Sequence, residues 1–431
     1  MKKTSLAFLF LALALPLAAQ TPAPPQTIAV KASRMFDGTS DSVVSNGVVL
    51  VQGGRITAVG SNLSIPADAQ VIDLGDATLM PAFIDAHVHL TGESSANWYK
   101  DFFEEQMRMP AEQAHYAARN ARRTIDAGFT TVRNVGAGDY VDVGLRNAIN
   151  DGVIIGPRIL TAVHAIGSTG GHGDDPAFPP DRVKQPGPIN GVCNGPDECR
   201  AAVRYQIKFG ADVIKFMPSG GVLSMSDPVD APELSQDEMD AIVEEAHHWG
   251  RKVAAHCHGD LAAKMAIEAG TDSIEHGSFM KTDTLQSMKE KGIYLVPTVM
   301  AVEWTGGKPE RFPPVIAAKA KAAYASHSDM FKNAIRIGVK IAFGTDSAVS
   351  PHGLNAQEFG LMVARGMTPA AALHTTWNAA VLLGLGDKVG TLEKGKFADI
   401  VAVPGNPLQD IHQTEHVFFV MKEGQTIRNA R

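Results

Sequence analysis

The stretch PAFIDAHVHL, from Pro81 to Leu90, ends an apolar run with three polar side chains. Side chains two residues apart along a strand point to the same face. Asp85, His87 and His89 would therefore share one face of a strand whose neighbours are apolar. Such a face is either an ordinary core that contains a structural histidine, or one wall of a metal site. The residues that follow along the chain decide between these two readings.

The middle of the chain alternates short apolar strands with helical patterns. The predicted helices cover 112–127, 197–209, 235–249 and 320–337. The third of these begins with the sequence SQDE, in which Ser235 precedes an acidic first turn, a pattern typical of a helix start. The predicted strands, in order, are 77–90, 129–136, 157–164, 212–221, 252–259, 272–278, 293–298 and 340–347.

Eight strands that alternate with helices predict an α/β fold of the (β/α)8 barrel type, a distorted TIM barrel. A doubly wound open sheet is the alternative. No Gly-rich phosphate loop follows the first strand, which disfavours a nucleotide-binding version of that alternative.

Both ends of the chain differ from the middle. Residues 27–72 and 389–431 read as short strands punctuated by Gly, Pro and Asn, a pattern typical of antiparallel sheets. We therefore predict one small β-sandwich domain built from residues 20–80 and 389–431, and a barrel over 81–388, with Pro81 at the junction.

The first residues resemble an export signal. Lys2 and Lys3 precede an apolar run that is too short to cross a bilayer, and small residues near Ala19 suit cleavage, so 1–19 is predicted to be a signal peptide. A membrane anchor is the alternative. No later stretch is apolar enough to span a membrane, and we expect a secreted or periplasmic protein without stable membrane insertion.

Three cysteines and the overall charge complete the picture. In an oxidising compartment Cys193 and Cys199 could form a disulfide or remain two free thiols, and Cys257 would stay single.

The 431 residues are 45% hydrophobic and 20% charged with a net charge of −7, values typical of a folded globular protein. Without a basic patch or zinc-finger spacing, no nucleic-acid partner is expected.

Polar residues fall at the carboxyl ends of five predicted strands, which is the end where barrels of this type carry their chemistry. They are His87 and His89, Lys215, His256, His276 and Asp346. Imidazole and carboxylate groups suit zinc and similar divalent ions. A lysine inside an apolar strand is costly to bury unless it is paired or chemically changed. The combination favours the metal-site reading of PAFIDAHVHL.

These motifs resemble the metal-dependent amidohydrolase superfamily, in its subtype with two metals. The resemblance extends over nearly the whole mature chain and includes GVVLVQGGRITAVG, PAFIDAHVHL, TTVRNVG, HCHG, IEHG, FGTDS and VGTLEKGKFADIVAV. Within the superfamily, GGHGD and IKFMPSGGV look like the branch of Xaa-Pro and Xaa-Arg dipeptidases, N-acyl amino acid carboxypeptidases and ochratoxin-degrading amidohydrolases.

The resemblance implies a role for each of the polar strand-end residues. His87, His89 and Asp346 would hold one divalent metal, and His256 and His276 would hold the second. A carboxylated Lys215 would bridge them, with Zn²⁺ as the expected metal. A hydroxide between the metals would attack the substrate carbonyl, while Asp346 serves as general base and then as general acid.

Other residues are secondary candidates. His164 ends the third strand and could hydrogen-bond the substrate carbonyl as a catalytic residue, and His172 in the following Gly-rich loop could do similar work or cap the loop. Arg133 could meet a substrate carboxylate or hold strand ends together. Asp85 could orient a ligand histidine or form a buried salt bridge. His258 has the same parity as His256, so strand periodicity alone does not choose between them.

Three functions remain open at this stage. The leading one is hydrolysis of the amide bond of a dipeptide or an N-acyl amino acid, including ochratoxin-like N-acyl-phenylalanine amides. A cyclic-amide hydrolase of the same superfamily and a non-catalytic binding protein are the alternatives. Segments 221–235 and 301–314 are the predicted pocket walls, and Arg311 could bind a carboxylate there. A homo-oligomer is expected from the resemblance.

Overall fold

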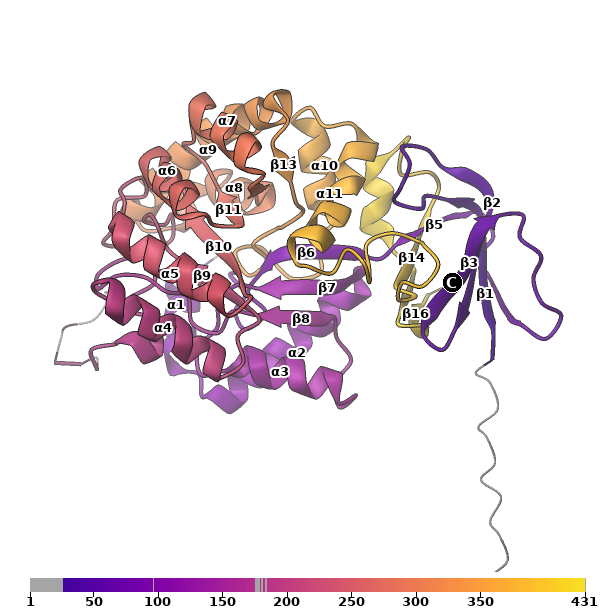
Figure 1. Ribbon diagram of the computed structural model, residues 1–431, viewed down its shortest axis with the longest axis horizontal. Helices are drawn as coiled ribbons and strands as arrows, with labels where there is room; N and C mark the ends of the chain where they lie inside the picture. Colours follow the sequence, from indigo (N-terminus) through magenta and orange to yellow (C-terminus); the bar gives the residue numbers. More distant parts are fainter. Residues whose placement is uncertain (1–25, 96, 175–178, 180, 183, 431) are drawn as a thin grey trace, which may run out of the picture.

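Eight parallel strands form a closed barrel in the computed structural model (Figure 1), which describes residues 26–95, 97–174, 179, 181–182 and 184–430. The predicted signal peptide at 1–19 lies outside the described residues. The barrel strands are β6 (Phe83–Val88), β7 (Phe129–Asn134), β8 (Arg158–Thr161), β9 (Val213–Phe216), β10 (Lys252–Cys257), β11 (Ser273–His276), β12 (Tyr294–Val296) and β13 (Lys340–Ile341).

The barrel closes at two seams between its hydrogen-bonded ladders. Strands β6, β7 and β8 form one ladder, and β9 to β13 form the other. At one seam the Ile166 amide donates to the Lys215 carbonyl at 2.8 Å, and at the other the Ala86 amide donates to the Phe343 carbonyl at 2.9 Å. The predicted TIM-barrel-like fold is therefore confirmed, and the alternative of an open sheet does not apply.

Helices surround the barrel on its outside (Figure 1). They are α1 (Trp98–Met107), α2 (Pro110–Asp126), α3 (Val141–Asn150), α4 (Pro196–Lys208), α5 (Gln236–His248), α6 (Asp260–Ala269), α7 (Thr282–Lys291), α8 (Val299–Gly306), α9 (Pro314–Ile337), α10 (Gln357–Ala364) and α11 (Pro369–Leu382). Short 3₁₀ turns occur at η1 (Pro188–Asn190), η2 (Pro309–Arg311) and η3 (Ile411–His416).

Local sequence signals set several helix ends. Ser235 and Glu238 form a capping box at the start of α5, as the predicted helix start implied. Helix α9 begins at Pro314, earlier than the predicted residue 320, because proline is well suited to the first helical turn. The same helix ends at Gly338, which adopts a left-handed conformation that favours glycine.

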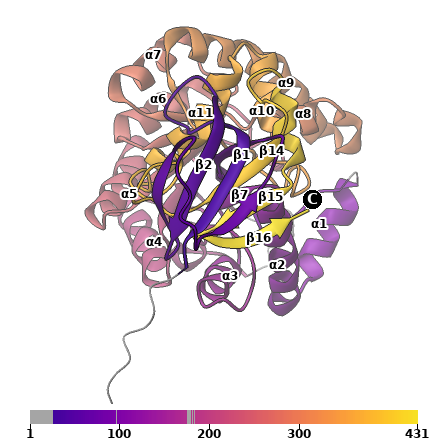
Figure 2. The same cartoon turned by 90° about the vertical axis from the view of Figure 1, so that its right-hand side faces the viewer.

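The two ends of the chain meet in one sheet beside the barrel (Figure 2). Its strands are β1 (Ile28–Met35), β2 (Val44–Gln52), β3 (Arg55–Ser61), β4 (Gln70–Asp73), β5 (Ala77–Pro81), β14 (Ile400–Pro404), β15 (Phe419–Lys422) and β16 (Gln425–Asn429). Strand β14 pairs antiparallel with β5, so the carboxyl-terminal strands continue the amino-terminal ones. That these strands form a two-layered sandwich stays a prediction.

The stretch predicted as one strand over 77–90 is two strands in different sheets. Strand β5 ends at Pro81, and β6 begins two residues later at Phe83. Proline has no amide hydrogen to continue a ladder, which favours a break at this point. Between the two strands the Ala82 amide donates to the Asp399 carbonyl at 3.0 Å and ties the barrel to the terminal sheet.

Aromatic rings fill the amino-terminal side of the barrel core. Phe83 and Phe129 begin adjacent strands, and their ring centroids lie 5.3 Å apart. Phe343 packs 5.4 Å from Phe129 and 4.5 Å from Phe359 of α10. All four rings are buried, so the barrel is a packed core and leaves its chemistry to the opposite end of the strands.

Cys193 and Cys199 form a disulfide that joins the loop after η1 to helix α4. Both cysteines are buried, and Cys257 is a buried free cysteine. Of the two possibilities left open by the sequence, the structure has the bonded one.

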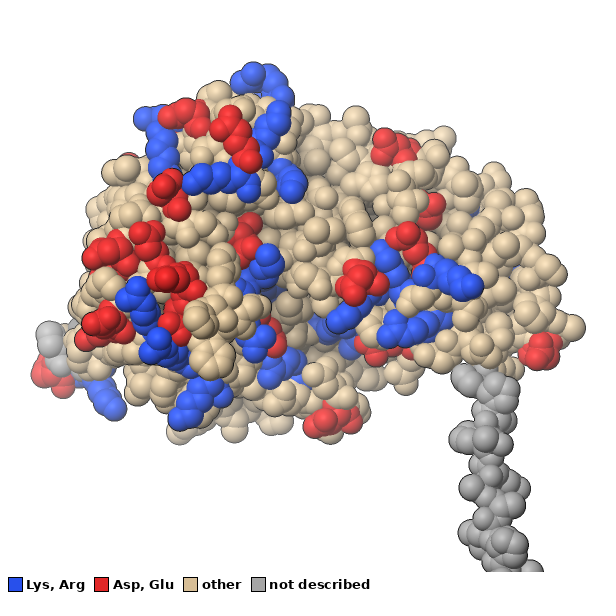
Figure 3. Space-filling view, in the orientation of Figure 1, with Lys and Arg blue, Asp and Glu red and all other residues tan. Residues whose placement is uncertain are grey.

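On the face in Figure 3 acidic and basic side chains lie near one another, separated by areas of other residues. None of the described helices combines the length and apolar character that crossing a membrane requires.

Candidate metal centre

Two groups of potential metal ligands lie at the carboxyl end of the barrel strands. The first consists of His87, His89 and Asp346, and the second of His256, His258 and His276. Within each group one ligand atom from every residue lies within 4.8 Å of the others. The strand-end residues predicted from the sequence are thus brought together from β6, β10, β11 and the segment after β13.

The first group is centred on the Asp346 carboxylate. Its Oδ1 atom lies 3.5 Å from Nε2 of His87 and 3.5 Å from Nε2 of His89. The Asp346 backbone has a φ of 57°, in the left-handed region, and its amide donates to the His87 carbonyl at 2.8 Å. The strained turn after β13 therefore directs this carboxylate toward the two histidines of β6.

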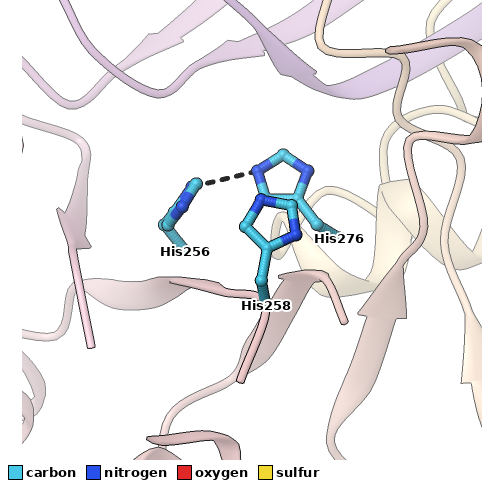
Figure 4. A group of neighbouring side chains, drawn as sticks. All are labelled: His256, His258 and His276. Carbon is cyan, nitrogen blue, oxygen red and sulfur yellow. Dashed lines mark hydrogen bonds between the residues drawn. The ribbon is translucent and has the colours of Figure 1, made fainter. Parts of the chain in front are cut away.

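The second group is formed by three imidazoles that face one another (Figure 4). Nδ1 of His256 and Nε2 of His276 lie 3.0 Å apart, and the rings of His258 and His276 stack at 4.9 Å. Strand periodicity alone could not choose between His256 and His258, whereas the resemblance implied His256 as the ligand. The structure places both in the group. The Nδ1 atom of His258 is also within 2.9 Å of the Ser278 hydroxyl.

These histidines are neutral, which is the form that binds metal. Burial holds the pKa of His87, His256 and His276 well below the usual value, and repulsion from neighbouring cations acts in the same direction. Burial also lowers the pKa of His89 and of His258 to about 3. No proton therefore competes with a metal for these rings at neutral pH.

The donor set fits divalent metal ions of the zinc type. Imidazole nitrogens and a carboxylate oxygen are the ligands that such ions prefer. Nε2 of His256 is buried and has no hydrogen-bond partner among the described residues, an arrangement that is costly unless another group satisfies the atom.

Lys215 lies on β9, and its side chain is 1% exposed. It borders the same cavity as both ligand groups. Burial lowers the pKa of its amine to about 8, although Glu275 and Asp346 act in the opposite direction. A substantial fraction of this amine is therefore neutral near physiological pH.

A cavity of about 200 Å³ opens over both groups, and most of the rest of its lining is apolar. Its lining includes Met217, Val222, Leu223, Val302, Ala323 and Val349. The predicted pocket walls are both represented, since Val222 and Leu223 come from segment 221–235 and Val302 comes from segment 301–314. The site therefore joins a polar reaction centre to a space for an apolar group.

The pattern that describes the Amidohydrolase family matches residues 78–428 of this chain, which include the barrel and the carboxyl-terminal strands. The chain belongs to the amidohydrolase family. It is a hydrolase that acts on carbon–nitrogen bonds.

Individual relatives of this amidohydrolase support the narrower branch. The ochratoxinase of Aspergillus niger is 35% identical over 408 residues, which cover 89% of this chain and 83% of the relative. A crystal structure of a Xaa-Pro dipeptidase with bound methionine in its active site has 40% identity and a TM-score of 0.89, covering 94% of this chain and 100% of the other. A prolidase complexed with N-methylphosphonate-L-proline has 28% identity and a TM-score of 0.86, with coverages of 94% and 100%.

Glu275 is a buried residue of this amidohydrolase that the sequence reasoning missed. Its Oε2 accepts from Nδ1 of His87 at 2.7 Å, which leaves Nε2 of that ring for a metal. Glu275 and His276 are neighbours and should face opposite sides of a strand. However, His276 adopts a φ of 69° at the strand end, and both side chains point inward. The motif IEHG indicated His276 as a ligand. The alternation of side chains along a strand, however, predicted that the neighbouring Glu275 would point away from the site.

Arg133 makes its contacts with protein groups, and these contacts give no support to the predicted contact with a substrate carboxylate. The side chain is fully buried, and its guanidinium donates to Glu275 at 2.8 Å and to the Ala86 carbonyl at 2.5 Å. The charge is balanced by Glu275 beneath the first ligand group. Of the two readings given for Arg133, the contacts support the structural one.

Asp85 braces the turn that carries Asp346. Its carboxylate accepts hydrogen bonds from the Thr345 hydroxyl at 2.7 Å, from Asn355 at 2.8 Å and from the His87 amide at 3.1 Å. Asp85 therefore connects β6 with the segment after β13, and it forms no salt bridge with any described residue. It accepts from the backbone amides of the ligand residue His87 and of Thr345, the residue before Asp346.

The remaining candidates differ in position. His172 borders the cavity, and its ring lies 4.4 Å from that of His256. His164 borders an adjoining cavity together with His89. Arg311 lies over the Trp304 ring at 5.3 Å and is outside the lining of both cavities, so the predicted carboxylate contact finds no support.

Proposed function

We propose that this amidohydrolase releases an amino acid with an apolar side chain from a dipeptide or an N-acyl amino acid. The observation that carries this proposal is the cavity in which both ligand groups adjoin an apolar wall. The names of two relatives point the same way, since one is an ochratoxinase and the other a Xaa-Pro dipeptidase whose active site contains methionine.

We infer that each ligand group holds one divalent metal, most simply zinc. His87, His89 and Asp346 would bind the first, and His256 and His276 the second, with His258 available beside them. When bound, the metals supply Lewis acidity that polarises a carbonyl and lowers the pKa of water.

Lys215 is the proposed link between the two groups as a carbamate. Its neutral amine adds through the nitrogen lone pair to the carbon of carbon dioxide and releases one proton. The lowered pKa, about 8, favours this reaction because only the neutral amine is a nucleophile. The product is an anionic oxygen ligand and removes the cost of a buried ammonium.

Asp346 is the proposed proton carrier. Burial raises the pKa of its carboxyl to about 7, although Lys215 acts in the opposite direction. A group in this range can accept the proton of the attacking water and return it to the leaving nitrogen at neutral pH. His164, whose pKa is lowered by burial, is neutral and can donate a hydrogen bond to the substrate carbonyl.

A substrate panel tests the reaction. Zinc-loaded protein is offered Ala-Phe, Ala-Leu, N-acetyl-phenylalanine and hydantoin, and free amino acid or ring-opened product is quantified. We expect release from the linear amides. Turnover of hydantoin without release from any linear amide would instead establish the cyclic-amide alternative.

The Asp346→Asn variant tests the proton transfer. The amide side chain keeps the shape of the carboxylate but cannot accept a proton, so we expect kcat to fall by about 10²–10⁴-fold. Metal content is measured in parallel. Near wild-type hydrolysis with both metals still bound would rule out the proposed role of Asp346.

We also propose that the protein is exported after removal of residues 1–19. The disulfide between Cys193 and Cys199 supports an oxidising compartment. Amino-terminal sequencing of the protein from an extracytoplasmic fraction should begin near Gln20, whereas a chain that retains Met1 would contradict the proposal.

A further inference from the structure

Helix α8 contributes to both halves of the site. Ala301, Val302 and Thr305 on this helix border the apolar cavity. The residue before the helix, Thr298, is fully buried, and its Oγ1 atom lies 2.7 Å from Nδ1 of His276. A single turn of the chain therefore touches the cavity wall and a candidate metal ligand.

The hydrogen bond to Thr298 bears on which nitrogen of His276 carries the ring proton. When the hydroxyl oxygen accepts a hydrogen bond from Nδ1–H, the lone pair is on Nε2. This Nε2 atom lies 3.0 Å from Nδ1 of His256, inside the second ligand group. A Thr298 hydroxyl that accepts from Nδ1 would therefore hold His276 in the tautomer that can bind a metal through Nε2.

The backbone at Thr298 is held in an unfavourable conformation. Its φ of 47° lies in the left-handed region, which a β-branched residue rarely adopts. A strained backbone conformation persists only where surrounding contacts enforce it, and residues in such conformations cluster at functional sites.

Three buried contacts hold this turn. The Glu358 carboxylate of α10 accepts from the Val299 amide at 2.9 Å and from the Met300 amide at 2.7 Å. His327 of α9 donates through Nε2 to the Pro297 carbonyl at 2.8 Å. Glu358 thus satisfies two of the free amides at the start of α8.

We propose that Thr298 is a positioning residue for His276, anchored by Glu358, so that one turn sets both the second ligand group and the α8 wall of the cavity. Thr298 itself touches neither metal nor substrate in this role. The effect on metal binding does not depend on which amide is cleaved, and only the consequence for hydrolysis rests on the proposed function.

The test uses Thr298→Val, which keeps the branched shape and removes the hydroxyl, with Thr298→Ser as the matched variant that retains it. Zinc affinity is measured by competition with a chromogenic chelator. Loss of an outer hydrogen bond to a ligand histidine lowers affinity by about 10–100-fold. We expect this loss for the second zinc equivalent of Thr298→Val, and close to wild-type affinity for Thr298→Ser.

Thr376→Val is the control for removal of a buried hydroxyl. Thr376 is 5% exposed, and its hydroxyl donates to the Leu373 carbonyl within α11. This variant should bind both zinc equivalents as wild type does. Equal zinc affinity of Thr298→Val and wild type would overturn the proposal, even if the thermal stability of the variant falls.

Glu358→Gln keeps the inference testable if Thr298→Val does not fold. The amide retains one acceptor for the two helix amides, and we expect weaker binding of the second zinc together with an altered KM for apolar substrates. In that case, a folded Glu358→Gln variant with the zinc affinity of wild type would contradict the positioning role. A wild-type protein that hydrolyses no amide, while Thr298→Val loses zinc, would reject the proposed function and leave this inference standing.

Discussion

At the scale of single residues, Glu275 decides how the first ligand group is supported. One carboxylate oxygen holds His87 at 2.7 Å, and the other holds Arg133 at 2.8 Å. All three residues are at most 1% exposed to solvent. A metal-binding ring and a buried cation therefore depend on the same carboxylate, which links stability to metal affinity.

Replacing Glu275 by Gln should impair both properties. The Arg133 charge would lose its buried partner, which typically costs about 3–5 kcal/mol of unfolding free energy. The His87 ring would lose its charged acceptor, and metal affinity should fall by about 10–100-fold. Urea unfolding and zinc competition measure the two effects.

The exposed Glu290 provides the control, because it accepts only from Gln286 on the surface of α7. Glu290→Gln should leave both measurements within error of wild type. A stable Glu275→Gln protein with undiminished zinc affinity would show that the carboxylate does not support His87.

The residues that the sequence predicted best are those whose chemistry is unusual where they stand. A lysine inside an apolar strand and histidines at strand ends identified Lys215, His87 and His256 as candidates that the fold brings together. Glu275 and the placement of Arg133 depend on a left-handed backbone at His276 and on contacts between strands β7 and β11. Neither property is contained in a local pattern.

At the scale of elements, Glu358 links the stability of the α8 turn to pH. Burial raises the pKa of this carboxyl from 4.5 to about 8 in the folded protein, whereas the two helix amides act in the opposite direction. Between these values the folded state binds more protons than the unfolded state. The contribution of Glu358 to the unfolding free energy is therefore greatest below pH 4.5 and is lost as the pH rises through about 8.

Glu358→Gln should remove this dependence. From about pH 5 to 8 the stability of wild type should decline relative to the variant, by at most about 1.4 kcal/mol per pH unit. Urea unfolding at several pH values across this range measures the difference. Glu268→Gln, which changes an exposed carboxylate paired with Lys291, should run parallel to wild type. A parallel profile for Glu358→Gln as well would refute the pH linkage.

The disulfide fixes a second element near the site. Cys193 lies in the loop after η1. Its own amide donates to the Gly167 carbonyl at 2.9 Å, and Gly167 is at the base of the loop that carries His172. The bond joins residues separated by 6 positions in sequence, and closing such a short loop contributes about 2 kcal/mol in the chain-entropy account.

The double variant Cys193→Ala, Cys199→Ala should lose about this much unfolding free energy. It should also become insensitive to dithiothreitol, whereas Cys257→Ala should remain as sensitive as wild type because that cysteine is unpaired. Thermal unfolding with and without reductant gives both results. Reductant sensitivity that persists in the double variant would exclude this disulfide as its cause.

Element boundaries were predicted where a local chemical signal fixes them. Ser235 and its capping partner determine the start of α5, and glycines determine several helix ends. The split at Pro81 was anticipated as a junction, but the two strands on either side of it read as one apolar run. Their separation depends on which sheet each strand joins, and this is a long-range property.

At the scale of the whole molecule, Asp399 connects the terminal sheet to the barrel. Its Oδ2 atom accepts from Thr130 of β7 and from Arg158 of β8, both at 3.0 Å. Its Oδ1 atom accepts from the Glu423 amide between β15 and β16 at 2.8 Å. The alternation of strands and helices predicted the barrel, and the similar patterns at both ends predicted that the ends meet. The contacts of this junction with the barrel are invisible in sequence because Asp399 is 269 residues from Thr130 and 241 residues from Arg158.

Asp399→Asn should therefore destabilise both parts together. The carboxylate is buried, and its loss leaves Arg158 with only the half-exposed Glu423 as a charged partner, a change of about 3 kcal/mol in unfolding free energy. Zinc affinity should not change, because the junction lies at the amino-terminal ends of β7 and β8, opposite the ligand groups. Asp76→Asn, which removes an exposed ion pair with Arg34, should cost less than about 1 kcal/mol.

The four tryptophans make the cooperativity of this junction measurable. Trp98, Trp249, Trp304 and Trp377 all lie on or at the ends of barrel helices, and Lys396 of the carboxyl-terminal segment lies 4.3 Å from the centroid of the Trp377 ring. Intrinsic fluorescence therefore follows chiefly the barrel. Far-ultraviolet circular dichroism follows the terminal sheet as well. If the Asp399 contacts unite the two parts, Asp399→Asn should shift both unfolding curves by the same amount. A shift confined to circular dichroism would mean that the terminal sheet unfolds while the barrel, with its metal centre, remains folded.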